Sequence, residues 1–153
     1  MVIGHHHVSF TISSLAVGED FFARFFDFRR IAGGRYQAPY VKTLVGYRDA
    51  VLDVAFLSLH GVSQSSAGLI VELIEYVEPK CSPADTATCR PGSAHLCLVV
   101  DDIQADYERM KEAGVEFLSP PNEVTYGVNK GSLVIYLKGP DNIRLELIQL
   151  ASS

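Results

Sequence analysis

The sequence has few cysteines, no long basic run and no long apolar run. Its three cysteines are an odd number without a zinc-type spacing, which favours a reducing compartment over a disulfide framework. No cluster of lysines and arginines is longer than Arg29-Arg30, and the formal net charge is −5, which argues against a phosphate backbone as partner. No apolar run approaches the roughly 20 residues that a membrane helix needs, and the N-terminus lacks an apolar signal region. We therefore expect a cytoplasmic protein that binds neither nucleic acid nor membrane.

The length and composition are those of one globular domain. The chain has 153 residues, of which 48% are hydrophobic and 20% are charged. This is enough to bury a core, but it is too short for two independent domains with separate roles. Two half-sized units that share one system of sheets fit this length best.

Two pairs of segments repeat each other in pattern. A stretch that begins at His95 repeats one that begins at His7, because in both a histidine is followed by an apolar strand and the start of a helix. A second pair of stretches closes each half, and there Glu146 falls on Glu72. The chain thus looks like two copies of one unit. Two such units packed around a pseudo-twofold axis would bring four good metal ligands together.

The first half is expected to form a strand, a helix and three further strands. Residues 2–13 alternate apolar and polar side chains, as a half-buried strand does. Residues 15–30 carry phenylalanines at helical spacing, and Gly33-Gly34 is expected to end that helix. Three strands should follow, within 40–47, over 51–59 and over 68–77, with a polar loop over 61–67 before the last.

The second half repeats this order after a linker over about 79–93 that contains three prolines. Asp101 is expected to cap its helix, and Gly114 is expected to end it. The buried stripe of that helix is predicted to be Ile103, Tyr107 and Met110. Strands are expected near 123–128, over 132–138 and around Glu146. The predicted fold is therefore α+β, a single domain over 1–153 with two tandem βαβββ modules, at about 1–78 and about 94–150.

The segments together resemble the vicinal oxygen chelate superfamily, which includes glyoxalase I, methylmalonyl-CoA epimerase, extradiol dioxygenases and bleomycin-resistance proteins. The resemblance covers nearly the whole chain. It rests on His-Val-Ser-Phe-Thr-Ile at His7, Val-Glu-Leu-Ile-Glu-Tyr around Glu72, His-Leu-Cys-Leu-Val-Val-Asp-Asp-Ile at His95, and Lys-Gly-Pro-Asp-Asn-Ile-Arg-Leu-Glu-Leu-Ile around Glu146. It implies two modules whose sheets curl around a metal-binding cleft, with one ligand from each of four strands. Those ligands would be His7, Glu72, His95 and Glu146, and they suit one divalent ion of nickel, cobalt, zinc, manganese or iron.

The resemblance also implies a chemistry. Members with four such ligands resemble isomerases, epimerases and lyases, which remove a proton next to a metal-bound carbonyl. Glu146 is the first candidate for the base, and Glu72 is its symmetrical alternative. Asp53 is a weaker candidate, because it lies roughly where methylmalonyl-CoA epimerase places an acidic residue. His5 is the alternative to His7 as a ligand, because strand alternation puts both on one face.

Two other functions stay open at this point. An extradiol-type dioxygenase generally uses only three protein ligands, and a drug-binding protein of the bleomycin-resistance type tends to lack the four. The expected substrate is a small molecule with vicinal oxygens or an activated carbonyl. A homodimer is expected by resemblance, with the metal site formed within one chain or shared between two. The tract His5-His6-His7 leaves open whether its first two histidines are an expression remnant.

Overall fold

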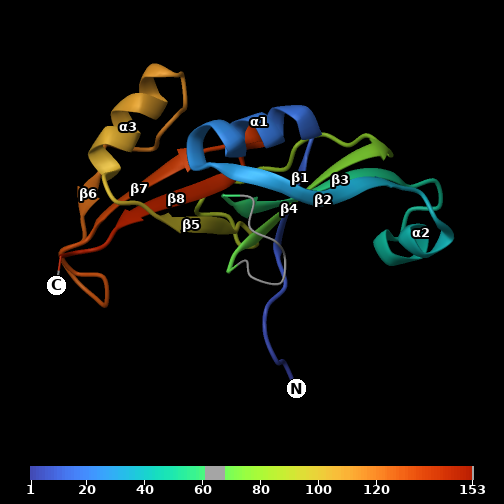
Figure 1. Cartoon of the computed structure of the whole chain (residues 1–153), viewed down its shortest axis with the longest axis horizontal. Coiled ribbons are helices and arrows are strands. Elements are labelled where there is room, and N and C mark those ends of the chain that lie inside the picture. The colour runs from blue at the N-terminus through green and yellow to red at the C-terminus, as the bar shows by residue number, and fades with distance from the viewer. Residues whose placement is uncertain (61–67, 153) are drawn as a thin grey trace. The chain divides into compact units, whose positions relative to one another are not determined.

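The computed structural model describes residues 1–60 and 68–152, which form two compact units, Met1–Pro83 and Ala84–Ser153 (Figure 1). Each unit contains one four-stranded mixed sheet. The strand order is β1-β4-β3-β2 in the first unit and β5-β8-β7-β6 in the second. The α+β class and the two glyoxalase-like modules expected from the sequence are thus confirmed. None of the helices in these residues is long and apolar enough to cross a membrane.

The two units share the order strand, helix and three strands, and the first has in addition a short helix between its second and third strands. The first contains β1 (Val8–Ile12), α1 (Leu15–Phe26), β2 (Phe28–Tyr36), α2 (Pro39–Val45), β3 (Val51–Leu59) and β4 (Ile70–Glu78). The second contains β5 (His95–Val99), α3 (Ile103–Glu112), β6 (Asn122–Glu123), β7 (Leu133–Lys138), a 3-10 turn (Pro140–Asn142) and β8 (Arg144–Gln149). In both, the first strand pairs in parallel with the last, and the other neighbours are antiparallel.

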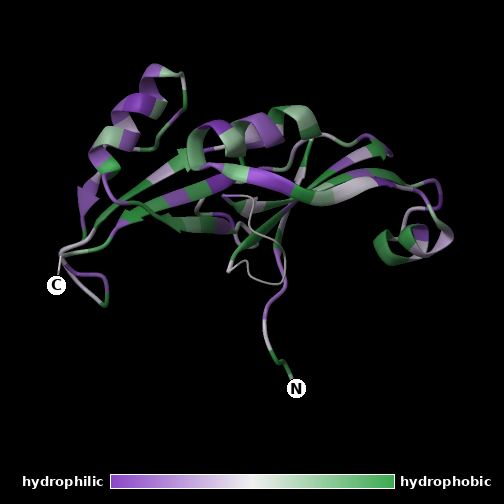
Figure 2. Ribbon diagram, in the orientation of Figure 1, coloured by the Kyte–Doolittle hydropathy of each residue, from purple (hydrophilic) through white to green (hydrophobic). Residues whose placement is uncertain are grey.

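One face of each sheet packs against a helix. A Cβ atom at Gly18 of α1 would lie 2.3 Å from Ile12 and 3.0 Å from Leu73, so the helix lies directly on the face that carries Leu73. In the second unit, Met110 of α3 and Leu147 of β8 are fully buried. Figure 2 shows hydrophobic and hydrophilic residues alternating along the strands, as expected for a sheet with two different faces.

The closing strand of each unit also contacts the start of its helix. The backbone N–H of Leu15 donates to Glu75 at 2.8 Å, and the backbone N–H of Ile103 donates to Gln149 at 2.9 Å. Each bond satisfies an N–H that has no partner within its own helix. Glu75 and Gln149 lie at equivalent positions, three residues after the candidate glutamate of their strand. Because side chains alternate between faces, the candidate glutamates point away from the helices.

The helix of the first unit is shorter than predicted. It ends at Phe26 rather than at residue 30, because Asp27 adopts a left-handed conformation with φ of 53°. Gly33-Gly34 lies inside β2 and does not end a helix. Gly33 has a φ of 126°, and a Cβ atom there would lie 2.1 Å from the carbonyl oxygen of Val54, so this glycine serves a close approach between two strands.

The strand predicted within residues 40–47 is wrong. These residues form most of α2, which begins with Pro39 at its first turn and ends at Gly46 with a φ of 76°. Proline at the start and glycine just past the end are typical helix boundaries. The strand over 51–59 is confirmed, and the strand over 68–77 is observed as β4. The polar loop over 61–67 lies outside the described residues.

Two predictions for the second unit need correction. Asp102, rather than Asp101, caps α3, and its carboxylate accepts the backbone N–H of Ala105 at 2.9 Å. The strand expected near 123–128 is only the two residues of β6. The buried stripe Ile103, Tyr107 and Met110 is confirmed.

Candidate metal centre

In the first unit, parallel pairing of β1 with β4 brings His7 next to Glu72. His7 immediately precedes β1, and Glu72 is paired with Ser9 of β1. Nε2 of His7 lies 3.2 Å from a carboxylate oxygen of Glu72, whose side chain is 14% exposed. Phe56 of β3 lies opposite Glu72 on the other side, and its ring packs edge-on against His7 with 5.8 Å between ring centroids. We call His7, Glu72, Ser9 and Phe56 the first half-site.

The second unit has the same arrangement. Nε2 of His95 lies 3.0 Å from a carboxylate oxygen of Glu146, whose side chain is 16% exposed. Glu146 is paired with Cys97 of β5 and with Tyr136 of β7. The Tyr136 ring packs edge-on against His95 with 5.2 Å between ring centroids, and its hydroxyl lies 3.5 Å from Nε2 of His95. We call His95, Glu146, Cys97 and Tyr136 the second half-site.

The second half-site contains two groups whose pKa values are raised. Burial, and next the neighbouring Glu146 carboxylate, raise the pKa of Cys97 to about 11. The same two causes, in the same order, raise the pKa of the Tyr136 phenol. A charged form beside a carboxylate in a partly dry environment is unfavourable. Both groups therefore stay protonated at neutral pH, and both can donate a hydrogen bond.

The geometry of both pairs fits a bound divalent ion. Two ligands at about 2.1 Å from an ion and at right angles to each other lie about 3.0 Å apart. The observed separations of 3.2 and 3.0 Å match this value. One imidazole and one carboxylate per unit is also a donor set that divalent transition-metal ions accept. Within residues 1–60 and 68–152 no group of three or more His, Cys, Asp or Glu side chains is placed to hold a metal, so each unit alone brings together only two of the candidate ligands.

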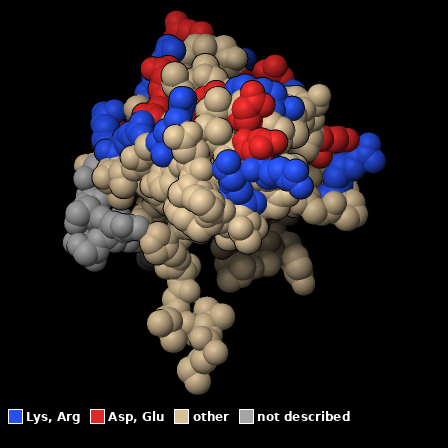
Figure 3. Space-filling view, turned by 90° about the vertical axis from the view of Figure 1, so that its right-hand side faces the viewer, with Lys and Arg blue, Asp and Glu red and all other residues tan. Residues whose placement is uncertain are grey.

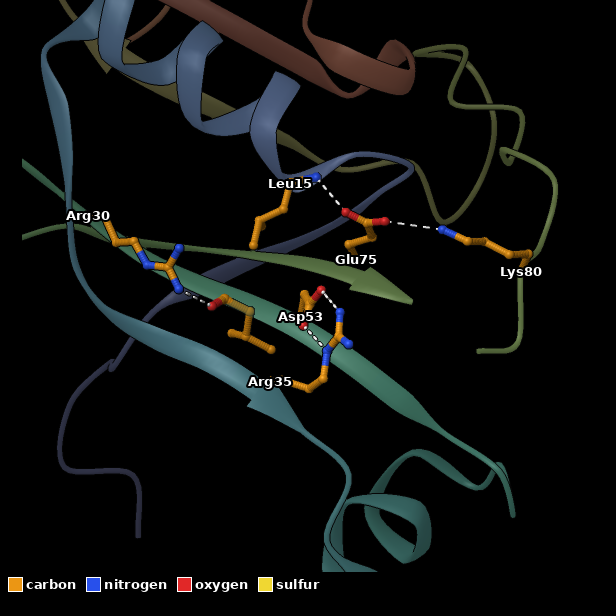
Figure 4. A network of polar contacts seen from close by, with 7 residues as sticks. Leu15, Arg30, Arg35, Asp53, Glu75 and Lys80 are labelled. Atoms are coloured by element: carbon orange, nitrogen blue, oxygen red, sulfur yellow. Dashed lines mark hydrogen bonds and ion pairs between the residues drawn. The ribbon is translucent and has the colours of Figure 1, made fainter. Parts of the chain in front are cut away.

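The two weaker candidates from the sequence are occupied elsewhere. Asp53 accepts two hydrogen bonds from Arg35, at 2.8 and 2.7 Å, which lower the pKa of its carboxyl group (Figure 4). It is paired with Glu75, and therefore lies on the helix side of the sheet and not on the side of Glu72. His5 contacts the carbonyl oxygen of Gly68 at 2.9 Å instead of Glu72.

The charged residues on the helix side of the first sheet neutralise one another. Glu75 accepts the N–H of Leu15 and forms an ion pair with Lys80 at 3.1 Å (Figure 4). Arg30 pairs with Glu19 at 3.0 Å. On the face shown in Figure 3, acidic and basic side chains are likewise interspersed rather than gathered into a field of one sign.

Sequence reasoning missed Phe56 and Tyr136. The two residues are equivalent in the structure, yet 72 − 56 = 16 positions separate Phe56 from its glutamate and 146 − 136 = 10 separate Tyr136 from its own. The unequal spacing hides the correspondence in a linear alignment. Cys97 had a readable signal, because it follows His95 by two residues as Ser9 follows His7.

The comparison with known families agrees with this architecture. A family model described as the Glyoxalase/Bleomycin resistance protein/Dioxygenase superfamily matches residues 4–147. The chain belongs to this superfamily. The match includes all four candidate ligands, from His7 to Glu146.

Members of the glyoxalase superfamily with known names or structures resemble the whole chain. A 2-epi-5-epi-valiolone epimerase from Actinomyces sp. is 27% identical over 149 residues, which are 95% of this chain and 78% of the relative. A glyoxalase family protein from Bacillus cereus superposes with a TM-score of 0.78 at 17% identity, over 99% of this chain and 97% of its own. Glyoxalase I from Zea mays gives a TM-score of 0.66 at 18% identity, over 97% of this chain and 45% of its own. The two solved structures support the fold alone.

Proposed function

We propose that this protein is a divalent-metal-dependent isomerase, epimerase or lyase that removes a proton next to a carbonyl group of a small molecule. The observation that carries the proposal is the repeated His-Glu pair, held in the same register and at the spacing of neighbouring metal ligands in both units. The epimerase among the relatives, whose substrate name denotes a ketone, supports the same class. The proposed substrate is a small molecule with a ketone or with vicinal oxygens.

The proposed metal ligands are His7, Glu72, His95 and Glu146. When bound, the ion would supply Lewis-acid polarisation of a substrate carbonyl. Nickel, cobalt, zinc, manganese and ferrous iron would all accept two imidazoles and two carboxylates. The two half-sites meet within one chain or across the two chains of a homodimer.

Glu146 is the proposed base. Its carboxylate takes the proton from the carbon next to the carbonyl, and the electron pair of the broken C–H bond forms a C=C bond as the carbonyl π electrons move onto its oxygen. The Cys97 thiol and the Tyr136 phenol beside it stay protonated, so they do not compete for that proton. Glu72 is an equivalent carboxylate in the other half-site. An epimerase that inverts a carbon centre needs to remove a proton from one face and return it to the other, and two carboxylates in equivalent half-sites supply both groups.

Metal stoichiometry tests the proposal. We expect about one equivalent of a divalent transition ion per chain, measured by elemental analysis after dialysis. Two matched double variants, His7→Ala with Glu72→Ala and His95→Ala with Glu146→Ala, should each lose all of it. Two equivalents in the wild type, of which each variant loses one, would instead show two separate sites. No uptake from nickel, cobalt, zinc or manganese would overturn the proposal in favour of a non-enzymatic binding protein.

Mixing the two double variants tests where the half-sites meet. Each variant lacks one pair of ligands and keeps the other. If the metal is held between two chains, the mixed dimer regains metal, because one of its sites combines both intact pairs. If it is held within one chain, mixing restores nothing.

Deuterium exchange into α-keto, hemithioacetal and acyl-CoA compounds then tests the proposed proton removal.

A further inference from the structure

A histidine outside the two half-sites, His6, contacts the first half-site. Nδ1 of His6 lies 2.7 Å from Nδ1 of His7, and the two rings meet edge-on with 5.0 Å between their centroids. The other ring nitrogen of His7, Nε2, faces Glu72 at 3.2 Å. The His7 imidazole is therefore held at both nitrogens, one of them by His6.

The two Nδ1 atoms are at hydrogen-bond distance, so one of them carries the proton and the other accepts it. A neutral imidazole carries its proton on one nitrogen and a lone pair on the other. For His7 to bind a metal through Nε2, its proton must be on Nδ1, and that N–H then needs an acceptor. The Nδ1 lone pair of His6 is placed to accept it. Partners of this kind fix the tautomer and the ring orientation of metal-binding histidines.

The second half-site orients its histidine differently. Within residues 1–60 and 68–152, no hydrogen-bond partner is present at Nδ1 of His95, and its ring instead packs against Tyr136. The equivalent of Tyr136 in the first half-site is Phe56, which has no hydroxyl. His6 therefore supplies a polar contact that only the first half-site has, on the opposite edge of the ligand histidine.

The preceding histidine offers a matched control. His5 contacts the carbonyl oxygen of Gly68, not a residue of the half-site. Neither His5 nor His6 lies within a strand or helix, so replacing either leaves the sheet pairing unchanged. The three consecutive histidines thus make three different contacts, and each can be tested on its own.

We propose that His6 is a positioning residue for the metal ligand His7: its ring accepts the Nδ1–H of His7 and keeps Nε2 directed toward the ion. This inference rests on the proposed function, because it assigns His6 a role only if His7 binds a metal. His6 itself is not a ligand in this arrangement. Asparagine, whose side-chain oxygen can reach a similar place, should replace it in part.

Cobalt(II) binding tests this role. Dissociation constants of the full-length protein are measured by competition with a chelator, and the visible absorption of bound cobalt reports the ligand geometry. We expect His6→Ala to weaken cobalt affinity by about 10- to 100-fold and to change the spectrum, while the capacity stays that of the wild type. His6→Asn should recover most of the affinity and the wild-type spectrum, and His5→Ala should bind as the wild type does.

The outcomes separate this inference from the proposed function. If wild type and His6→Ala bind cobalt equally well, the role of His6 is overturned and the metal proposal stands. If His6→Asn is as weak as His6→Ala, or if either variant loses capacity, His6 does not act by accepting one hydrogen bond. A wild type that takes up no cobalt overturns both proposals. Thermal unfolding of the metal-free variants is the control for misfolding, and each variant should unfold at the temperature of the wild type.

Discussion

The two half-sites share one backbone and differ in the side chains around it. Each joins a histidine and a glutamate through the same parallel register, at 3.2 Å in the first and 3.0 Å in the second. The neighbours differ, because Phe56 and Ser9 surround Glu72 whereas Tyr136 and Cys97 surround Glu146. The two half-sites have in common the histidine and the glutamate that are the candidate metal ligands. They differ in the side chains beside the glutamate, so a reaction at one carboxylate would have different neighbours from a reaction at the other.

Replacing the two glutamates one at a time should break the symmetry most strongly. Glu146→Gln removes the proposed base, so we expect deuterium exchange into substrate to fall by about 100- to 10,000-fold. Glu72→Gln keeps a side-chain oxygen for the ion, so at saturating metal it should keep exchange within about tenfold of the wild type but lose inversion of the carbon centre, because the second proton donor is gone. Exchange is followed by NMR and inversion by chiral chromatography. Equal losses of exchange in both variants would show that the two carboxylates are not specialised.

The thiol beside Glu146 should react slowly. A pKa raised from 9.0 to about 11 makes the Cys97 thiolate about 100-fold scarcer near neutral pH. A more basic thiolate is also more nucleophilic, which raises its rate of alkylation by about tenfold. The net alkylation of Cys97 should therefore be about tenfold slower than that of an ordinary exposed cysteine. Iodoacetamide labelling of the metal-free protein at pH 8, read by peptide mass spectrometry, compares Cys97 with Cys81 and Cys89, and all three residues are exposed.

A matched variant extends this test to the first half-site. Ser9→Cys places a thiol opposite Glu72, as Cys97 lies opposite Glu146. It should label as slowly as Cys97 does if the two half-sites are electrostatically alike. Fast labelling of Cys97 itself would contradict the raised pKa.

The smallest expected effect comes from the hydroxyl of Tyr136. Tyr136→Phe makes the second half-site resemble the first, and loss of one hydrogen bond should lower the turnover number by about fivefold. Phe56→Tyr is the matched control and should give no gain, because its hydroxyl would lie beside Glu72 and not beside the proposed base. Steady-state kinetics on the substrate with the fastest exchange measures both. An unchanged Tyr136→Phe variant would show that the hydroxyl has no part in turnover.

Much of the fold could be predicted because the sequence contains the same pattern twice, so each predicted element in one half supports its equivalent in the other. The strand after His7 and the strand after His95 support each other, and the glutamates of the closing strands do the same. The prediction failed where the halves differ. Residues 39–45 form a helix that has no counterpart in the second unit, and the apolar residues within 40–47 favoured a strand. The Pro39 and Gly46 boundaries were readable, but a seven-residue helix is too short to show a clear period.

The candidate site was only partly predictable for a different reason. The type of a metal ligand is visible in the sequence, so the histidine and glutamate of each half-site could be named. The residues beside them are set by the register between strands, which a single sequence does not specify. Phe56 and Tyr136 become neighbours of the glutamates only through antiparallel pairing. The contact of His6 with His7 depends on the path of a segment outside any strand, which no periodicity describes.

The hydrogen bond between each closing strand and the first turn of its helix affects how freely the two copies can diverge in sequence. Glu75 and Gln149 make the same contact with different chemistry, one charged and one neutral, and each acts only within its own unit. Substitutions at distant positions without shared partners have nearly independent effects on stability. Once a repeat anchors its own helix, mutations that it accumulates are tolerated or rejected separately from those of the other repeat. The two copies can therefore carry different side chains beside their glutamates, a phenol and a thiol in one and a phenyl ring and a serine in the other.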